Sequence, residues 1–148
     1  MIARRPAAIM AALAALLVPA VARAQGKAHR IAIQVSTGEA ATMTLALHNA
    51  QNAIDLFKSR GEPVSVEIVA FGPGLTMLRA DTSPVKAMLT RMIAADPGLV
   101  LSACHNTMMA MAHAEGHPIP ILPAARVVPA GIVRLVELQE AGWSYIRP

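Results

Sequence analysis

The sequence contains one cysteine, Cys104, and aromatic side chains make up only 3% of it. A single cysteine cannot form a disulfide within the chain, and the lack of a C-x-x-C pair excludes a thioredoxin-type dithiol. The aromatic content is too low for the stacking platforms that bind single-stranded nucleic acid. The Walker A, H-E-x-x-H and G-x-G-x-x-G motifs are also absent, and the acidic residues are scattered without an acid–base pair. These absences leave the lone thiol as the residue of greatest chemical interest.

The N-terminal segment has the three parts of a secretory signal peptide. Basic residues precede an apolar run from about Ala7 to Ala22, and the Ala-Arg-Ala pattern at 22–24 marks a cleavage site. An uncleaved membrane anchor is the alternative, but the apolar run is shorter than the ~20 residues that a spanning helix needs. The sequence therefore predicts a signal peptide over 1–24, a domain over 25–148 and a periplasmic location.

The net charge of +4 belongs largely to that N-terminal segment. The segment holds three of the 13 basic residues and none of the nine acidic ones, so its removal leaves ten basic against nine acidic residues, a net charge of +1. A nearly neutral domain lacks the broad positive surface by which proteins bind nucleic acid. We therefore expect no nucleic-acid partner, and no membrane association after the signal peptide is removed.

Short β-branched segments alternate with longer amphipathic segments along the rest of the chain. The pattern predicts strands at 29–36, 63–71, 99–104, 125–128 and within 143–148, and helices at about 40–60, 83–95, 105–116 and 129–142. Ser36 and Glu39 are spaced as a capping box for the first helix, and Ser83 before Pro84 predicts the N-cap of the second. Alternating strands and helices form βαβ units, so we expect one α/β domain with a mostly parallel sheet and helices on both faces.

Three segments of the chain are predicted to meet at one edge of this sheet. Ligands of open parallel sheets bind beyond the carboxyl ends of the strands. Ser-Thr-Gly-Glu follows the first strand, Gly-Pro-Gly follows the second, and Cys104 ends the third. We therefore predict a ligand pocket formed by Ser36, Thr37, Gly38, Gly72, Gly74 and Asn106.

Cys104 is expected where a strand becomes a helix. The free N–H groups and the positive dipole end of that helix favour thiolate over thiol, and thiolate is the form that attacks disulfides, persulfides or carbonyls. A buried cysteine that packs as a small hydrophobe is the alternative. His105 could lower the pKa of the thiol or act as a base, although neighbours in sequence rarely face each other and this histidine could simply be exposed. Cys104 and His105 are thus the candidate catalytic pair.

The helix after Cys104 has two stripes at helical spacing. The first stripe predicts a face that packs on the core and consists of Cys104, Met108 and Met111. The second stripe consists of His105, Met109, His113 and His117. Thioether and imidazole groups suit Cu(I), so this second stripe is an alternative soft-metal site, although a methionine stripe is more often core. In the loop after Gly-Pro-Gly, Arg79 could bind an anion or be a solvated charge, and Asp81 could be an acid–base group or cap the next turn.

Four segments taken in order resemble the DsrE/DsrF-like family of small sulfur-handling proteins, and in particular its exported branch. They read IQVSTGEAATMTLALHNAQN, VEIVAFGPGLTMLRADTSPV, SACHNTM and VVPAGIVRLVELQEAGWSYIRP, and the resemblance covers roughly Arg30 to Pro148. It implies a flavodoxin-like three-layer sandwich with a five-stranded, mainly parallel sheet, often assembled as a trimer or hexamer. Better-understood members carry sulfur as a persulfide on one cysteine, whose counterpart here is Cys104. Those members act in the cytoplasm beside partner subunits, whereas this chain is predicted to be exported.

The leading hypothesis is therefore a periplasmic sulfur carrier of the sulfurtransferase type. Cys104 would accept sulfane sulfur from a donor and pass it to an acceptor thiol on a protein or a small molecule, with no cofactor. The first alternative is a periplasmic binding module for Cu(I) or a small ligand. The second alternative is a non-catalytic oligomeric protein whose cysteine is inert.

Overall fold

A computed structural model describes residues 28–148, and the predicted signal peptide lies outside that range. Five strands form one sheet in the order β4-β3-β2-β1-β5, and every neighbouring pair is parallel. The elements are β1 (His29–Val35), α1 (Ala40–Ser59), β2 (Val64–Ala70), the 3-10 helix η1 (Gly72–Leu78), α2 (Lys86–Ala95), β3 (Leu99–Cys104), α3 (His105–Glu115), β4 (Ala125–Val128), α4 (Gly131–Glu140) and β5 (Ser144–Ile146).

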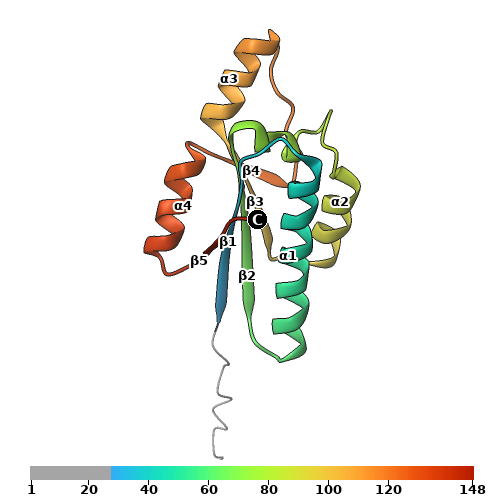
Figure 1. Ribbon diagram of the computed structural model, residues 1–148, viewed down its shortest axis with the longest axis vertical. Coiled ribbons are helices and arrows are strands. Elements are labelled where there is room, and N and C mark those ends of the chain that lie inside the picture. The colour runs from blue at the N-terminus through green and yellow to red at the C-terminus, as the bar shows by residue number, and fades with distance from the viewer. Residues whose placement is uncertain (1–27) are drawn as a thin grey trace, which may run out of the picture.

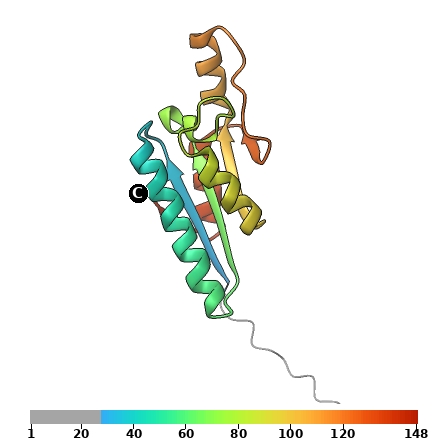
Figure 2. The same cartoon turned by 90° about the vertical axis from the view of Figure 1, so that its right-hand side faces the viewer.

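The molecule is a three-layer sandwich. Helices α1 and α2 cover one face of the sheet and α4 covers the other (Figure 1), and the turned view separates the same layers (Figure 2). The chain moves from β1 through β2 and β3 to β4, and then crosses to the far side of β1 to form β5. The prediction of a flavodoxin-like α/β fold with a mostly parallel sheet is confirmed, and the described sheet is parallel throughout.

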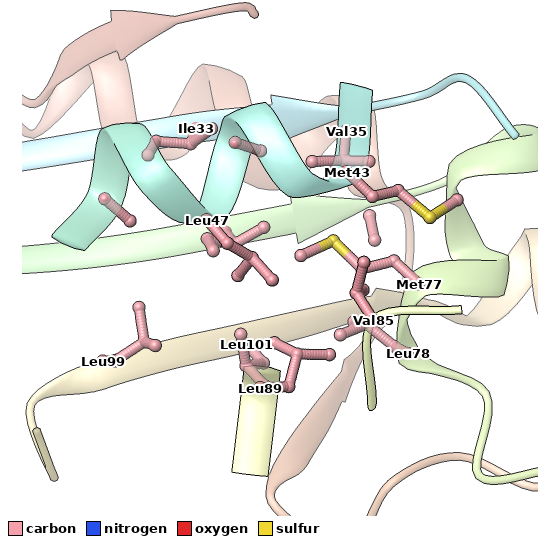
Figure 3. Close-up of a cluster of buried hydrophobic side chains, with 14 of the residues drawn as sticks. Ile33, Val35, Met43, Leu47, Met77, Leu78, Val85, Leu89, Leu99 and Leu101 are labelled. Carbon is pink, nitrogen blue, oxygen red and sulfur yellow. The ribbon is translucent and has the colours of Figure 1, made fainter. Parts of the chain in front are cut away.

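The main core lies between the sheet and the α1–α2 layer. Figure 3 shows apolar side chains from β1, α1, η1, α2 and β3 meeting there, among them Ile33, Leu47, Met77, Leu89 and Leu101, which are all at most 2% exposed. A smaller cluster beneath α4 buries Ala32, Val69, Leu135 and Leu138. The central strands are thus covered on both faces, which explains why β2 and β3 are mostly apolar instead of alternating with polar residues.

Helix α3 departs from the predicted packing. It projects beyond the carboxyl ends of the strands (Figures 1 and 2), and none of its residues is fully buried. Met108 and Met111 are only partly buried against the core, and Met109 is 57% exposed. The prediction that the stripe of Cys104, Met108 and Met111 packs on the sheet is therefore only partly correct, because both methionines are only partly buried. The reason is that η1 lies beside the end of β3, so α3 contacts η1 and the end of the strand instead of lying along the sheet.

The predicted serine caps are also wrong. Helix α1 has Glu39 at its N-cap without a side-chain capping bond, because the Ser36 hydroxyl accepts a hydrogen bond from Gln34 Nε2 at 2.9 Å. The Ser83 hydroxyl donates to the Met77 carbonyl oxygen at 2.5 Å, and α2 begins only after Val85. In both places a partner outside the helix holds the hydroxyl. Within residues 28–148 no helix is long and apolar enough to cross a membrane.

Candidate functional site

Cys104 is the last residue of β3 and the N-cap of α3. Its Cα partner on β4 is Val128, and only 5% of the residue is exposed. The thiol therefore stands at the carboxyl end of an inner strand, at the foot of the projecting helix. This is the edge of the sheet where open α/β proteins bind their ligands.

Hydrogen-bond donors from two helices surround the Cys104 sulfur. Burial raises the pKa of this thiol, but the Thr107 hydroxyl and the N–H groups of Gly131, Thr107 and Asn106 outweigh burial, so the pKa lies below its ordinary value. The Cys104 side chain makes no regular capping hydrogen bond, so these donors act on the sulfur mainly by charge–dipole attraction. The surroundings of the sulfur therefore favour the thiolate.

The Thr107 hydroxyl is oriented by the segment that follows β2. Its oxygen accepts a hydrogen bond from the Gly72 N–H at 2.9 Å. A hydroxyl that accepts through a lone pair keeps its own hydrogen free to donate elsewhere. That hydrogen is available to Cys104, so Gly72 is connected to the sulfur through Thr107.

The first residue of α4, Gly131, also lies at the site, and its position requires a glycine. A Cβ atom on Gly131 would lie 2.8 Å from Phe71 Cδ1, which is closer than real Cβ contacts allow. Because Gly131 has no side chain, the first turn of α4 can lie directly against Phe71 and direct its N–H toward Cys104. The N–H of Asn106 also donates to the Pro129 carbonyl oxygen at 3.3 Å, which joins the start of α3 to the segment before α4.

A groove of about 630 Å³ runs along one side of α3. It brings together three of the predicted pocket residues, Gly38, Gly72 and Asn106, and adds Thr107 beside them. Its other lining residues are Pro73, Thr76, Ala110, Met111 and Ala114. Thr107 belongs both to this groove and to the surroundings of the sulfur, but Cys104 itself does not line the groove.

The other three predicted pocket residues lie behind this groove and do not line it. Gly74 is buried, and a Cβ atom there would lie 2.3 Å from the Val35 carbonyl oxygen, so it allows η1 to pack on the end of β1. Ser36 is bonded to Gln34, as described above. The Thr37 Oγ1 atom is buried and has no hydrogen-bond partner among residues 28–148. These three residues therefore belong to the packing at the end of β1 and not to the groove lining.

His105 points to the opposite side of α3. It is exposed, it is not among the main groups that shift the pKa of Cys104, and it lines a second groove of about 570 Å³. Met109, His113 and His117 line the same groove, so the second stripe does share one surface. Among the described residues, however, no three His, Cys, Asp or Glu side chains are grouped so that they could hold a metal ion.

Arg79 is neither a solvated charge nor a free anion site. It is 7% exposed, and its Nη2 atom lies 2.8 Å from Asp81 Oδ2 and 2.9 Å from Glu115 Oε2. Arg79 holds the pKa of Asp81 well below its usual range, and it lowers the pKa of Glu115 as well. Asp81 is thus unsuited to acid–base chemistry near neutral pH, and the cluster ties the end of α3 to the loop after η1.

Thr107 and Gly131 were not among the residues predicted from the sequence. Thr107 stands at the third position of a helix that begins after Cys104, where backbone N–H groups point to the N-cap side chain, so the N-cap pattern could have indicated it. Gly131 has no such local signal. Its approach to the sulfur depends on the pairing of β4 with β3 and on the path of α4.

Comparison with known proteins supports the fold and does not name an activity. No family model matches the chain, and no curated protein sequence matches it either. The fold is similar to that of a solved structure described as a protein of unknown function, MTH1491, from Methanobacterium thermoautotrophicum. The two chains are 27% identical with a TM-score of 0.67, over 81% of this chain and 99% of that one.

Proposed function

We propose that this protein is a periplasmic sulfur carrier of the DsrE/DsrF type, in which Cys104 holds one sulfane sulfur atom as a persulfide. The observation that carries the proposal is the position of the buried Cys104 thiol at the N-cap of α3, where the Thr107 hydroxyl and the N–H groups of Asn106, Thr107 and Gly131 lower its pKa. The sequence resemblance to that family and the shared α/β architecture support it. A one-atom carrier needs no second cysteine.

The transfer needs no external oxidant or reductant. The Cys104 thiolate attacks the outer sulfur of a donor persulfide, R–S–SH; the donor S–S bond breaks, R–S⁻ leaves, and Cys104–S–SH forms. An acceptor thiolate then attacks the outer sulfur of Cys104–S–SH, the new S–S bond breaks, and the Cys104 thiolate is released. A low thiol pKa helps the second half-reaction because it makes Cys104 a better leaving group.

Donor and acceptor would reach the sulfur along α3. The grooves on its two sides begin at Asn106 and Thr107 on one side and at His105 on the other. Both are largely apolar in their lining residues, which suits a thiol carried by a protein segment or a small organic molecule better than a free inorganic ion. The projection of α3 beyond the sheet leaves both grooves open to such partners.

Mass spectrometry of the intact protein tests the carrier role. After incubation with a small-molecule persulfide donor, we expect an adduct of about 32 Da, one sulfur atom, that disappears with a reducing thiol. The Cys104→Ser variant should show no adduct. A wild-type protein that gains no mass under these conditions would refute the proposal.

Export is tested separately from chemistry. We expect the full chain to be found in the periplasmic fraction with its N-terminus at Gln25, and a chain that lacks residues 1–24 to stay in the cytoplasm. Retention of the complete N-terminal segment in a membrane fraction would favour the membrane anchor instead.

We also propose that the chain forms a homo-oligomer, a trimer or hexamer. The support is an exposed apolar surface on α4, where Ile132, Val133 and Val136 are 59%, 52% and 45% exposed. Sedimentation should give a mass above that of one chain, and Val136→Glu should lower it. Leu56→Glu, at an equally exposed position on α1, is the matched control and should leave the mass unchanged. A monomeric wild-type protein would contradict the proposal.

A soft-metal role is the second candidate, because His105, Met109, His113 and His117 line one groove. An anaerobic Cu(I) titration separates it from the first. Sub-micromolar binding that is lost in His113→Ala would support a copper site, and a flat titration would remove it.

A further inference from the structure

A buried carboxylate joins four elements beneath the candidate site. Glu67 on β2 is 1% exposed and accepts a hydrogen bond from the Ser102 hydroxyl of β3 at 2.7 Å. Arg134 of α4 donates to both carboxylate oxygens, from Nε at 2.8 Å and from Nη2 at 2.9 Å. Arg126 of β4 lies 2.6 Å from Glu67 Oε2 and also donates to the Ser102 hydroxyl oxygen at 3.0 Å.

On β3, β4 and α4, each member of this cluster lies two or three residues from a residue at the Cys104 site. Ser102 precedes Cys104 by two residues on β3, so both side chains point to the same face of the sheet. Arg126 precedes Val128, the β4 partner of Cys104, by the same interval. Arg134 follows Gly131 by about one helical turn, and its N–H bonds to the Ala130 carbonyl oxygen at 3.0 Å. The cluster and the thiol are therefore covered by the same helix.

The bond between Arg134 and Glu67 is directional. Burial raises the pKa of Glu67, but hydrogen bonds from Arg134, Ser102 and Arg126 outweigh burial, so the carboxyl stays ionised. A planar guanidinium that donates twice to one carboxylate fixes both the distance and the rotation of the side chain. The third side of Arg134 faces Glu137, with Nη1 at 3.3 Å from its Oε2. Sliding or lifting α4 would break this pair and leave the buried Glu67 carboxylate with Arg126 as its remaining arginine partner, which is unfavourable.

We propose that Arg134 is a positioning residue of the Cys104 site: its forked pair with Glu67 fixes the first turn of α4, so that the Gly131 N–H points at the sulfur. The inference rests on the proposed role of Cys104 as a thiolate. Arg134 does not contact the reacting sulfur in this scheme and acts only through Gly131. Loss of the fork lets the helix start move away from Phe71 and weakens one of the donors at the sulfur.

The test is the rate of alkylation of Cys104 by iodoacetamide as a function of pH, with the full wild-type protein as reference. Arg134→Gln should alkylate about three- to tenfold more slowly near neutral pH and titrate at higher pH, because a donor to a charged group is weakened. Arg134→Lys keeps the positive charge but not the fork, and should also be slower. Arg126→Gln removes the other arginine of the same carboxylate, on β4 instead of α4, and should stay within about twofold of wild type.

Three results would overturn the inference. A wild-type rate in Arg134→Gln shows that the fork does not matter. A wild-type rate in Arg134→Lys shows that only the charge matters. An Arg126→Gln variant that alkylates as slowly as Arg134→Gln shows that the electrostatic field of the whole cluster, and not positioning by Arg134, sets the rate. Should Arg134→Gln fail to fold by circular dichroism, Arg134→Lys decides alone: slower alkylation supports positioning, and the wild-type rate refutes it.

The outcome of this experiment does not depend on whether the sulfur-carrier proposal is correct. Alkylation uses no sulfur donor, so slower Arg134 variants support positioning even if the wild-type protein gains no sulfur. Conversely, a persulfide adduct on wild type together with unaffected Arg134 variants leaves the carrier role standing and removes the positioning role.

Discussion

At the scale of single residues, the hydroxyl hydrogen of Thr107 is free to point at the Cys104 sulfur because its oxygen is occupied by the Gly72 N–H. Thr107→Val keeps the shape of the side chain and removes the hydroxyl. The pH profile of Cys104 alkylation should therefore move to higher pH, and the rate near neutral pH should fall about three- to tenfold. Thr107→Ser retains the hydroxyl and should keep the wild-type profile. Identical profiles for the valine and serine variants would exclude Thr107 as a donor.

The position of Cys104 could be predicted from sequence, but most of its surroundings could not. The apolar run of β3 followed by a helical pattern places the residue at a strand end without knowledge of any other element. His105 is next to Cys104 in the chain, yet it lies on the side of α3 that faces away from the groups acting on the sulfur. Gly131 is distant in sequence and reaches the thiol through the path of α4. Adjacency in sequence was thus a poor guide to contact at this site.

At the scale of elements, α3 is a helix with little support from the rest of the molecule. None of its residues is buried, and a short helix without tertiary packing is marginal in water. Amide hydrogen exchange should therefore be faster in α3 than in α1, which buries Met43, Leu47 and Ile54. Glu115→Gln weakens the pairing with Arg79 that holds the end of α3, and should speed exchange there further. Equal protection of α3 and α1 in the isolated chain would contradict this expectation.

The first turn of α4 packs so closely on Phe71 that it requires glycine at position 131. Gly131→Ala should push the first turn away from Phe71, destabilise the fold by about 1–3 kcal/mol and slow Cys104 alkylation. Gly38→Ala is the matched control for stability, because its new Cβ would meet Pro73 Cβ at 3.4 Å, an ordinary contact. Thermal unfolding of the two variants measures the first effect, and alkylation of Gly131→Ala against the wild-type protein measures the second. A Gly131→Ala protein with the wild-type stability and rate would show that the helix start tolerates a side chain.

Hydrophobic periodicity predicted the elements better than their packing. The bounds of β3 and β4 are those expected, because a Pro-Gly turn precedes β3, a helical pattern begins directly after it, and prolines lie close to both ends of β4. The stripe of Cys104, Met108 and Met111 marks one face of α3 but does not say what covers that face. Here η1 occupies part of the space at the end of the sheet, and no periodicity in α3 itself reports this. Likewise, Ser83 has the pattern of an N-cap, but Met77 from η1 takes its hydroxyl.

At the scale of the whole molecule, Glu67 couples the stability of the fold to pH. Its pKa in the folded protein is lowered, so its contribution is fully present above the ordinary glutamate pKa of about 4.3 and is lost as the pH falls through the lower folded value. Glu67→Gln should cost about 2–4 kcal/mol at neutral pH, because two arginines lose a buried partner.

Chemical denaturation at several pH values measures this coupling. The wild-type free energy of unfolding should fall between about pH 5 and pH 3, and the Glu67→Gln variant should fall less steeply over the same interval. Parallel curves for the two proteins would mean that Glu67 is not the group responsible. Asp81 and Glu115, whose pKa values are also lowered, contribute to the slope that the variant retains.

The crossing of the chain from β4 to the far side of β1 also means that the Cys104 site is completed by a distant part of the chain. The donors of α3 follow Cys104 directly, whereas Gly131 stands at the start of α4, which the Glu67–Arg134 pair joins to β2. The acidity of the Cys104 thiol therefore reports whether α4 is docked on the sheet.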